Sequence, residues 1–319
     1  MLKINIPAIL FSFIIFLTGS AQAETTYSEV FIFGDSLSDT GNLASVTGDF
    51  PAPYYMNRVS NGAVAVETLV HKLGHTADAS LHLLGLNSGD NYSVAGANAA
   101  GGEAIDLSTQ ILSFQANNGF TAPADALYVI FIGGNDVRSA RDTADRQIAK
   151  STIKSAVATV SESIEALAQI GARSFLLVNA PNIALIPETN LIATATDSPA
   201  LLKKSRKLSN MYRVGLHKQA ESLEETYDIN IVEFDLFKFF NKLVKKADSY
   251  GFTNTTDACF STLSLTFHPD CNYGMNADAF IFFDEIHPSS RMHEIIGEAF
   301  YDELTEENED EDEDEEEED

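Results

Sequence analysis

Short, continuously apolar stretches that end in glycine or polar residues recur along this chain. Four of them have the length and the strand-forming residues of buried strands: Glu29–Phe33, Ala126–Ile132, Ser174–Val178 and Ile229–Phe234. A fifth, shorter strand is predicted over Asn91–Ala97. Between them, apolar residues recur at helical spacing, which predicts helices over Arg58–Gly74, Leu107–Phe114, Thr143–Ile170, Ser198–Tyr227 and about Ser290–Leu304.

Strands that are apolar throughout and alternate with helices are typical of a parallel sheet that helices cover on both faces. No internal repeat and no proline- or glycine-rich linker interrupts this alternation. We therefore expect one α/β domain over residues 24–305, with a central parallel sheet in a three-layer α/β/α arrangement.

The N-terminus has the features of a secretory signal peptide over residues 1–23. Lys3 precedes an apolar core from about Ile6 to Leu17, and small residues end the segment at Ala23. A retained membrane anchor is the alternative, which the short apolar core disfavours. We expect cleavage after Ala23 and a soluble protein that is secreted or periplasmic.

Acidic residues dominate the charge, but unevenly. The formal net charge is −27, and residues 306–319 consist of acids except for Asn308. Such a segment has no apolar surface to bury, so we expect a disordered acidic tail over 306–319. Its simplest role is to aid solubility, with a calcium or partner site as the alternative. The acidic balance argues against nucleic acid as a partner.

Cys259 and Cys271 are the two cysteines of the chain. An exported protein with two thiols most simply pairs them, and a loop of this size would add about 3 kcal/mol of stability in the chain-entropy model. No second pair of Cys or His stands at ligand spacing, so a metal site is not expected. His71 and His75 lie one helical turn apart but have no third ligand, and we expect a surface pair there.

Small and polar residues follow three of the predicted strands. They are Gly34-Asp35-Ser36, Ala95-Gly96-Ala97 and Gly134-Asn135-Asp136. The carboxyl ends of parallel strands form the sites of open α/β sheets. Ser36 is the candidate nucleophile, and the backbone N–H groups of Ser36 and Gly96, with the Asn135 amide, are candidate donors to an oxyanion. Alone, Gly-Asp-Ser is also an ordinary surface turn.

Asp284 and His287 follow the apolar run Phe280–Phe283 near the C-terminus. Their spacing lets the carboxylate accept a hydrogen bond from Nδ1–H of His287, which leaves Nε2 free to take the proton of Ser36. The chain contains no G-x-S-x-G, no P-loop and no H-E-x-x-H motif, which disfavours an α/β-hydrolase and the other enzyme classes that these motifs mark.

Taken together, these blocks resemble the GDSL lipase/esterase family, also called SGNH hydrolases. The matching blocks are Gly34-Asp35-Ser36-Leu37, Asn91–Ala97, Gly133-Gly134-Asn135-Asp136 and Asp284-Glu285-Ile286-His287-Pro288. The resemblance implies a flavodoxin-like three-layer fold and ester hydrolysis without a cofactor or metal. It implies a catalytic triad of Ser36, His287 and Asp284, with Ser36, Gly96 and Asn135 as the oxyanion hole. Ala95 and Phe283 depart from the usual glycine and tryptophan and bear on packing or substrate shape.

A narrower resemblance is to secreted bacterial lysophospholipases A and glycerophospholipid:cholesterol acyltransferases. It implies a lipid or lysophospholipid substrate, a possible sterol acceptor and transient contact with a membrane surface. The loop between Cys259 and Cys271 would then form a lid over an acyl chain, opened by an activating protease, or a simple staple. A carbohydrate or small-molecule acyl esterase is the nearest alternative, and a non-catalytic surface-binding module is disfavoured by the intact catalytic set.

Overall fold

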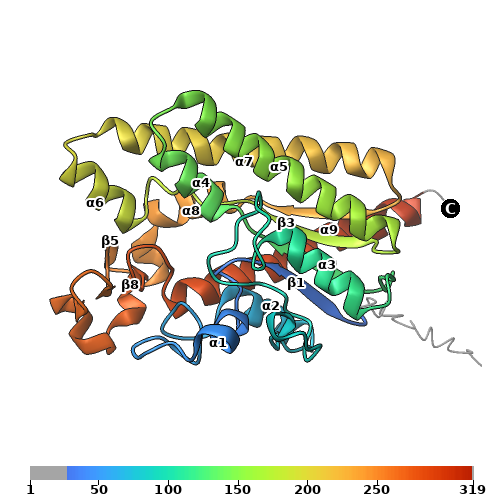
Figure 1. Ribbon diagram of the computed structural model, residues 1–319, viewed down its shortest axis with the longest axis horizontal. Helices are drawn as coiled ribbons and strands as arrows, with labels where there is room; N and C mark the ends of the chain where they lie inside the picture. The colour runs from blue at the N-terminus through green and yellow to red at the C-terminus, as the bar shows by residue number, and fades with distance from the viewer. Residues whose placement is uncertain (1–26, 318–319) are drawn as a thin grey trace, which may run out of the picture.

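A four-stranded parallel sheet forms the centre of the computed structural model, which describes residues 27–317 (Figure 1). Its strands stand in the order β1-β2-β3-β4 and cover Val30–Gly34, Leu127–Phe131, Ser174–Val178 and Asn230–Phe234. The register aligns Val30 with Leu127, Ser174 and Asn230 across the sheet. Their carboxyl ends therefore lie along one edge. Every end of the four strands lies within one residue of its predicted position. The predicted parallel sheet is confirmed.

The segment after Asp90 extends the sheet on the free side of β1. Ile32 N–H donates to the carbonyl of Asp90, and Tyr92 N–H donates to the carbonyl of Ile32. Val94 N–H continues this pattern to the carbonyl of Gly34. Only an isolated bridge, not a full strand, forms here. The resulting spatial order, with this segment outside β1, matches the 2-1-3-4-5 order of flavodoxin-like sheets.

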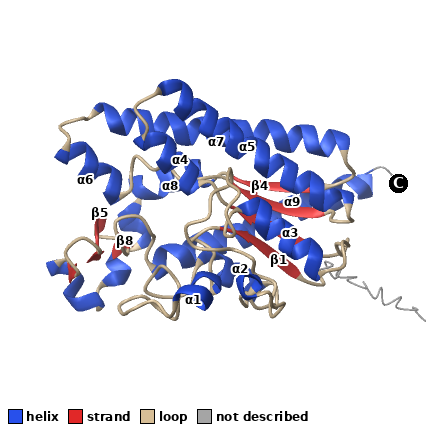
Figure 2. Cartoon of the chain, in the orientation of Figure 1, coloured by secondary structure: helices blue, strands red, loops and turns tan. Residues whose placement is uncertain are grey.

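Helices cover both faces of the sheet, as the alternation predicts (Figures 1 and 2). One layer contains α3, α4, α5 and α7, and α2 packs against α9 in the other. The helices are α1 Asn42–Thr47, α2 Ala65–Lys72, α3 Leu107–Asn117, α4 Gly134–Asp142, α5 Arg146–Gln169, α6 Pro187–Ala195, α7 Ala200–Thr226, α8 Leu236–Lys245 and α9 Ser290–Glu317. Within the described residues, no helix combines the length and apolar character that crossing a bilayer requires.

Several elements differ from the sequence-based expectation. Helix α2 begins at Ala65, not Arg58, because Arg58 ion-pairs with Glu67 and its segment forms turns. Helices α4, α6 and α8 were not predicted; α6 begins at a proline and α8 at the capping side chain of Asp235. Two small sheets also form, from β5 Asn254–Ala258 with β8 Phe280–Phe282 and from β6 Phe260–Ser261 with β7 Thr266–Phe267.

The last helix extends into the acidic C-terminal segment. Helix α9 continues to Glu317, whereas the charge pattern predicts disorder from residue 306. Glutamate has a high helix propensity, and a helix that is already packed through its first half needs no new nucleus to extend. The predicted signal peptide, residues 1–23, lies outside the described residues.

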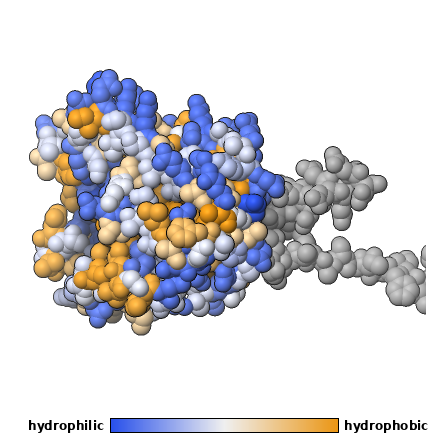
Figure 3. All heavy atoms as spheres, turned by 45° about the vertical axis from the view of Figure 1, so that its right-hand side comes forward, coloured by the Kyte–Doolittle hydropathy of each residue, from blue (hydrophilic) through white to orange (hydrophobic). Residues whose placement is uncertain are grey.

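The core is built from the strands and the helix faces that touch them. Phe31, Ile32, Val129 and Leu176 are almost fully buried. Phe31 and Phe33 pack their rings against Phe114 of α3. The surface in Figure 3 mixes hydrophilic residues with scattered apolar patches. Apolar surface of this kind is ordinary for a folded protein, so the site must be identified from its geometry.

Candidate active site

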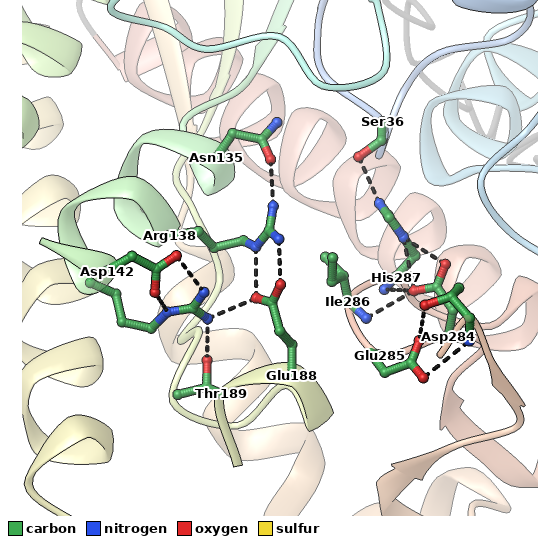
Figure 4. A network of polar contacts seen from close by, with 12 residues as sticks. Ser36, Asn135, Arg138, Asp142, Glu188, Thr189, Asp284, Glu285, Ile286 and His287 are labelled. Atoms are coloured by element: carbon green, nitrogen blue, oxygen red, sulfur yellow. Dashed lines mark hydrogen bonds and ion pairs between the residues drawn. The ribbon is translucent and has the colours of Figure 1, made fainter. Parts of the chain in front are cut away.

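The candidate nucleophile stands on the turn after β1. Gly34 is required at the end of the strand because a Cβ there would lie 2.4 Å from the carbonyl oxygen of Phe131. The Asp35 carboxylate accepts the N–H of Leu37 at 3.0 Å and closes the turn. The Oγ atom of Ser36 then lies 2.8 Å from Nε2 of His287, a residue 251 positions further along the chain (Figure 4).

Asp284 and His287 form a compact turn after β8. Oδ1 of Asp284 accepts the backbone N–H groups of Ile286 and His287, each at 2.8 Å. Nδ1 of His287 lies 2.9 Å from both carboxylate oxygens. With Nδ1–H as the donor to this carboxylate, Nε2 carries the lone pair that faces the Ser36 hydroxyl. The arrangement therefore has the geometry of a nucleophile, a base and an orienting acid.

Asp284 is ionised despite its burial. Burial opposes the charged form, but the nearby charge of His287 and the hydrogen bonds from His287 and Ile286 outweigh it and lower the pKa of Asp284. An ionised carboxylate here stabilises the imidazolium that forms when Ser36 loses its proton. Asp35 behaves differently, since burial raises the pKa of its carboxyl to about 6.

Tyr54 is a fourth member of this chain of groups, and the sequence motifs do not include it. Its hydroxyl donates to Oδ2 of Asp284 at 2.8 Å. Burial, followed by the charge of Asp284, raises the pKa of Tyr54 above its ordinary value, so the hydroxyl stays protonated as a donor. The Tyr54 ring packs edge-on against Phe283 and Phe260. Tyr54 therefore holds Oδ2 of the carboxylate that also faces Nδ1 of His287.

We expect Tyr54→Phe to lower kcat/KM about 10-fold, because one hydrogen bond to a buried carboxylate is lost. The less solvated carboxylate favours imidazolium at His287, so the acid limb of the pH profile should move to higher pH. The measurement is kcat/KM on a short soluble ester across the acid range. Tyr227→Phe is the matched control, since that hydroxyl also donates to a carboxylate, of Glu165, at the surface. An unmoved profile and unchanged rate would assign Tyr54 to packing alone.

The three candidate oxyanion donors come from the turn after β1, the turn that contains Gly96 and the start of α4. Gly96 has φ +89°, a left-handed conformation that favours glycine. Among the residues that the structure describes, no hydrogen-bond acceptor pairs with the backbone N–H of Ser36 or of Gly96. Nδ2 of Asn135 donates to the carbonyl of Ala97 at 2.9 Å, which brings the β2 turn against the Gly96 turn. Ser36 and Asn135 line the same cavity.

Two buried carboxylates hold these turns together. Asp39 accepts the N–H groups of Gly41, Asn42 and Leu43, and its Oδ2 also accepts the N–H of Ala95 at 2.8 Å. Asp136 accepts the N–H groups of Ala99 and Ala100 at 2.7 and 2.9 Å. Burial raises the pKa of both carboxyls, and these hydrogen bonds oppose the rise. Asp136 belongs to the third sequence block and Asp39 follows the first, but neither block reveals these hydrogen-bond partners.

A cavity lined largely by apolar side chains opens beside Ser36 and His287. Its polar wall includes Asn135 and Arg138, on α4. Its apolar wall is drawn from the ends of the strands, from the loop after β3 and from α8 and α9: Leu37, Phe131, Pro181, Ile183, Ile186, Leu236, Phe240, Phe282, Ile286, Pro288 and Ile296. A group that binds here would place an apolar chain next to the nucleophile.

Cys259 and Cys271 form a disulfide, as the thiol count predicts. The sequence leaves open whether the loop between them is a lid over an acyl chain or a simple staple. Phe260 is buried against Tyr54, Phe283 and Phe267 in a separate small core, and no residue between the two cysteines lines the cavity. Aromatic rings pack best against other rings already held in place, and Phe283 and Tyr54 provide them.

The loop between the two cysteines is also hydrogen-bonded to the turn that carries Asp284. Thr262 donates its N–H and its hydroxyl to the Glu285 carboxylate, the hydroxyl at 2.7 Å. Phe260 N–H donates to the carbonyl of Phe283 at 2.7 Å. The loop therefore braces the segment that leads into Asp284. The described residues contain no group of three or more side chains placed to hold a metal ion.

The fold and this geometry fit an ester hydrolase in which Ser36 is the candidate nucleophile. A profile of the family described as GDSL-like Lipase/Acylhydrolase matches residues 30–300. The chain belongs to this family.

Two curated relatives and one solved structure show the range of its similarity. It is 25% identical to a GDSL esterase/lipase of Arabidopsis thaliana, with 88% of each chain covered. It is 24% identical to a phosphatidylcholine-sterol acyltransferase of Aeromonas hydrophila, with 76% of this chain and 68% of that protein covered. The structure of an acetylxylan esterase variant from Geobacillus stearothermophilus aligns with a TM-score of 0.44 at 16% identity, over 88% of this chain and 95% of that one.

Proposed function

We propose that this protein is an exported serine ester hydrolase that cleaves acyl esters of phospholipids or lysophospholipids. In this proposal Ser36 attacks the ester carbonyl, His287 takes the serine proton and later protonates the leaving alcohol, and Asp284 orients His287. The oxyanion is held by the N–H groups of Ser36 and Gly96 and the amide of Asn135. No cofactor or metal takes part.

The observation that carries the lipid substrate is the apolar wall of the cavity. Leu37, Ile183, Ile286 and Phe240 line it close to the nucleophile, where an acyl chain would gain from burial. A site for sugar esters would instead need polar groups to bind hydroxyls. Similarity to a phosphatidylcholine-sterol acyltransferase supports the same substrate class and makes a sterol a candidate acceptor.

Contact with a lipid surface is part of the proposal. Four large side chains of the disulfide loop and the turn after it are mostly exposed: Leu263 (80%), Leu265 (75%), Tyr273 (84%) and Met275 (73%). They project from a segment that is itself braced against the catalytic acid, so a membrane that buried them would lie near the site. The net charge of −27 favours a zwitterionic surface over an anionic one.

Product analysis tests the substrate class. The protein is incubated with a mixed phospholipid and lysophospholipid extract, with and without cholesterol, and in parallel with acetylated xylooligosaccharides. We expect free fatty acid from the lipids, and cholesteryl ester if a sterol serves as acceptor. Release of acetate from the sugar without fatty acid from the lipids would establish the alternative, a carbohydrate acyl esterase. Ser36→Ala is the blank for contaminating activity.

Limited proteolysis tests the prediction that an activating protease acts on the loop. A cut near Leu263, which is 80% exposed, should leave Phe260 and the disulfide in place and free the tip to adapt to lipid. We expect the ratio of long-chain to short-chain ester turnover to rise after the cut, because short soluble esters need no lipid surface. Mass spectrometry maps the cut. An unchanged ratio would show that the loop has only a structural role and that its cleavage does not activate the protein.

A further inference from the structure

The Asn135 amide has two orientations, and one of them directs its N–H groups at the oxyanion. In the structure Oδ1 of Asn135 accepts Nη1–H of Arg138 at 3.0 Å (Figure 4). A guanidinium has donors and no acceptor, so the amide oxygen, never the amide nitrogen, must face Arg138. Nδ2 then gives one N–H to the carbonyl of Ala97 and keeps the other for the substrate.

We infer that Arg138 is a positioning residue for the oxyanion hole, which fixes the orientation of the Asn135 amide. Both residues lie on α4, Gly134–Asp142, one helical turn apart, and both line the cavity. This spacing lets the Arg138 side chain fold back along the helix to Asn135. The inference rests on the ester-hydrolase chemistry proposed above.

Arg138 is itself held firmly, which a positioning residue requires. Its Nε and Nη2 atoms donate to the two oxygens of Glu188 at 2.9 and 2.5 Å, a two-point contact that sets the plane of the guanidinium. Glu188 also accepts Nη1–H of Arg141 at 2.8 Å. Arg141 is 2% exposed and is held in turn by Asp142 and Thr189. Asn135 is the member of this network that lies beside Ser36 in the cavity lining.

The same network meets the other side of the site. The backbone N–H of Glu188 donates to the carbonyl of Glu285 at 2.8 Å, one residue after Asp284. Helix α6, which carries Glu188, therefore touches both the oxyanion side and the acid side of the cavity (Figure 4). Helix α6 therefore contacts the turn that carries Asp284 directly, through Glu285, and contacts the Asn135 amide through Arg138.

The expected effect is on the chemical step. A correctly turned amide stabilises negative charge that appears only in the transition state. The ground-state ester is neutral at this oxygen and gains little from it. Loss of Arg138 should therefore lower kcat and leave KM nearly unchanged.

A double-mutant cycle on a short soluble ester tests the inference. We expect Asn135→Ala to lower kcat about 10²-fold or more, as for loss of one oxyanion donor. Arg138→Gln should lower kcat about 10-fold, because glutamine has both a donor and an acceptor and no longer enforces the amide orientation. The Asn135→Ala/Arg138→Gln pair should lose no more than Asn135→Ala alone. Arg138→Lys, a donor-only cation, should recover part of the loss.

Folding is controlled separately. Glu188 keeps Arg141 as a partner in Arg138→Gln, so the variant should melt close to wild type. Arg213→Gln is the matched control, since Arg213 pairs with Asp235 at 3.1 Å and has similar exposure, away from the cavity. It should leave kcat unchanged.

Three results would overturn the inference: losses that multiply in the double variant, a rise in KM with unchanged kcat, or a fall in kcat that Arg213→Gln shares. If Ser36→Ala abolishes turnover while Arg138→Gln has no effect, the inference fails and the proposed function stands. If Ser36→Ala retains turnover, the proposed function fails whatever the cycle shows.

Discussion

Replacement of Ser36 by alanine is expected to lower ester hydrolysis by about 10³-fold or more, the scale of losing a triad member. The hydroxyl lies 2.8 Å from Nε2 of His287 and lines the apolar cavity, so its removal takes away the attacking atom while the cavity keeps its shape. The measurement is kcat/KM on a short soluble ester, with thermal unfolding to show that the variant is folded.

Covalent labelling makes the test independent of rate. A serine-directed phosphonate should modify Ser36 in the wild-type protein, as mapped by mass spectrometry, and should leave Ser36→Ala unmodified. Ser38, two positions away, is fully buried and serves as the internal control for non-specific labelling. Wild-type turnover in Ser36→Ala, or labelling at another serine, would remove Ser36 from the mechanism.

His287→Ala is expected to have a loss of similar size, about 10³-fold or more, because Ser36 then has no base. In the wild-type protein only neutral imidazole accepts the serine proton, so kcat/KM should fall as the pH drops through the acid range. The lowered pKa of Asp284 keeps that carboxylate charged through the same range. One acid limb is therefore expected.

Asp284→Asn is the companion variant. Its oxygen still accepts the N–H groups of Ile286 and His287 that shape the turn, so we expect a smaller loss than for His287→Ala. His293→Ala is unsuitable as a control because that residue also lines the cavity. His71→Ala is the control variant, because His71 is exposed on α2, and it should leave the rate unchanged. An unchanged rate in His287→Ala, or a pH profile flat through the acid range, would contradict this assignment.

Much of the fold follows from local pattern. The strands β1 to β3 are apolar at nearly every position, because both faces of a central parallel sheet are buried, and this signal needs no knowledge of distant residues. The long helices α5 and α7 were predicted within a few residues for the same kind of reason. The shorter α4, α6 and α8 were not, since their apolar runs are brief and their starts depend on caps and on packing.

The candidate site divides in the same way. The candidate site residues could be named from the sequence motifs: Ser36, Gly96 and Asn135, and the pair Asp284 and His287. Parallel strands bring their carboxyl ends to one edge, so the order of the blocks was enough to predict that these residues meet. Their motifs are local and could be recognised without coordinates.

The side chains that hold these candidate site residues in place become visible only in the folded structure. Tyr54 meets Asp284 across 230 positions, and Arg138 reaches both Asn135 on its own helix and Glu188 on α6. The disulfide loop turns its aromatic rings towards Tyr54, away from the acyl cavity, because a small core of rings was available there. Such partners depend on how loops from distant parts of the chain pack together, and packing at close range is not encoded in any one stretch of residues.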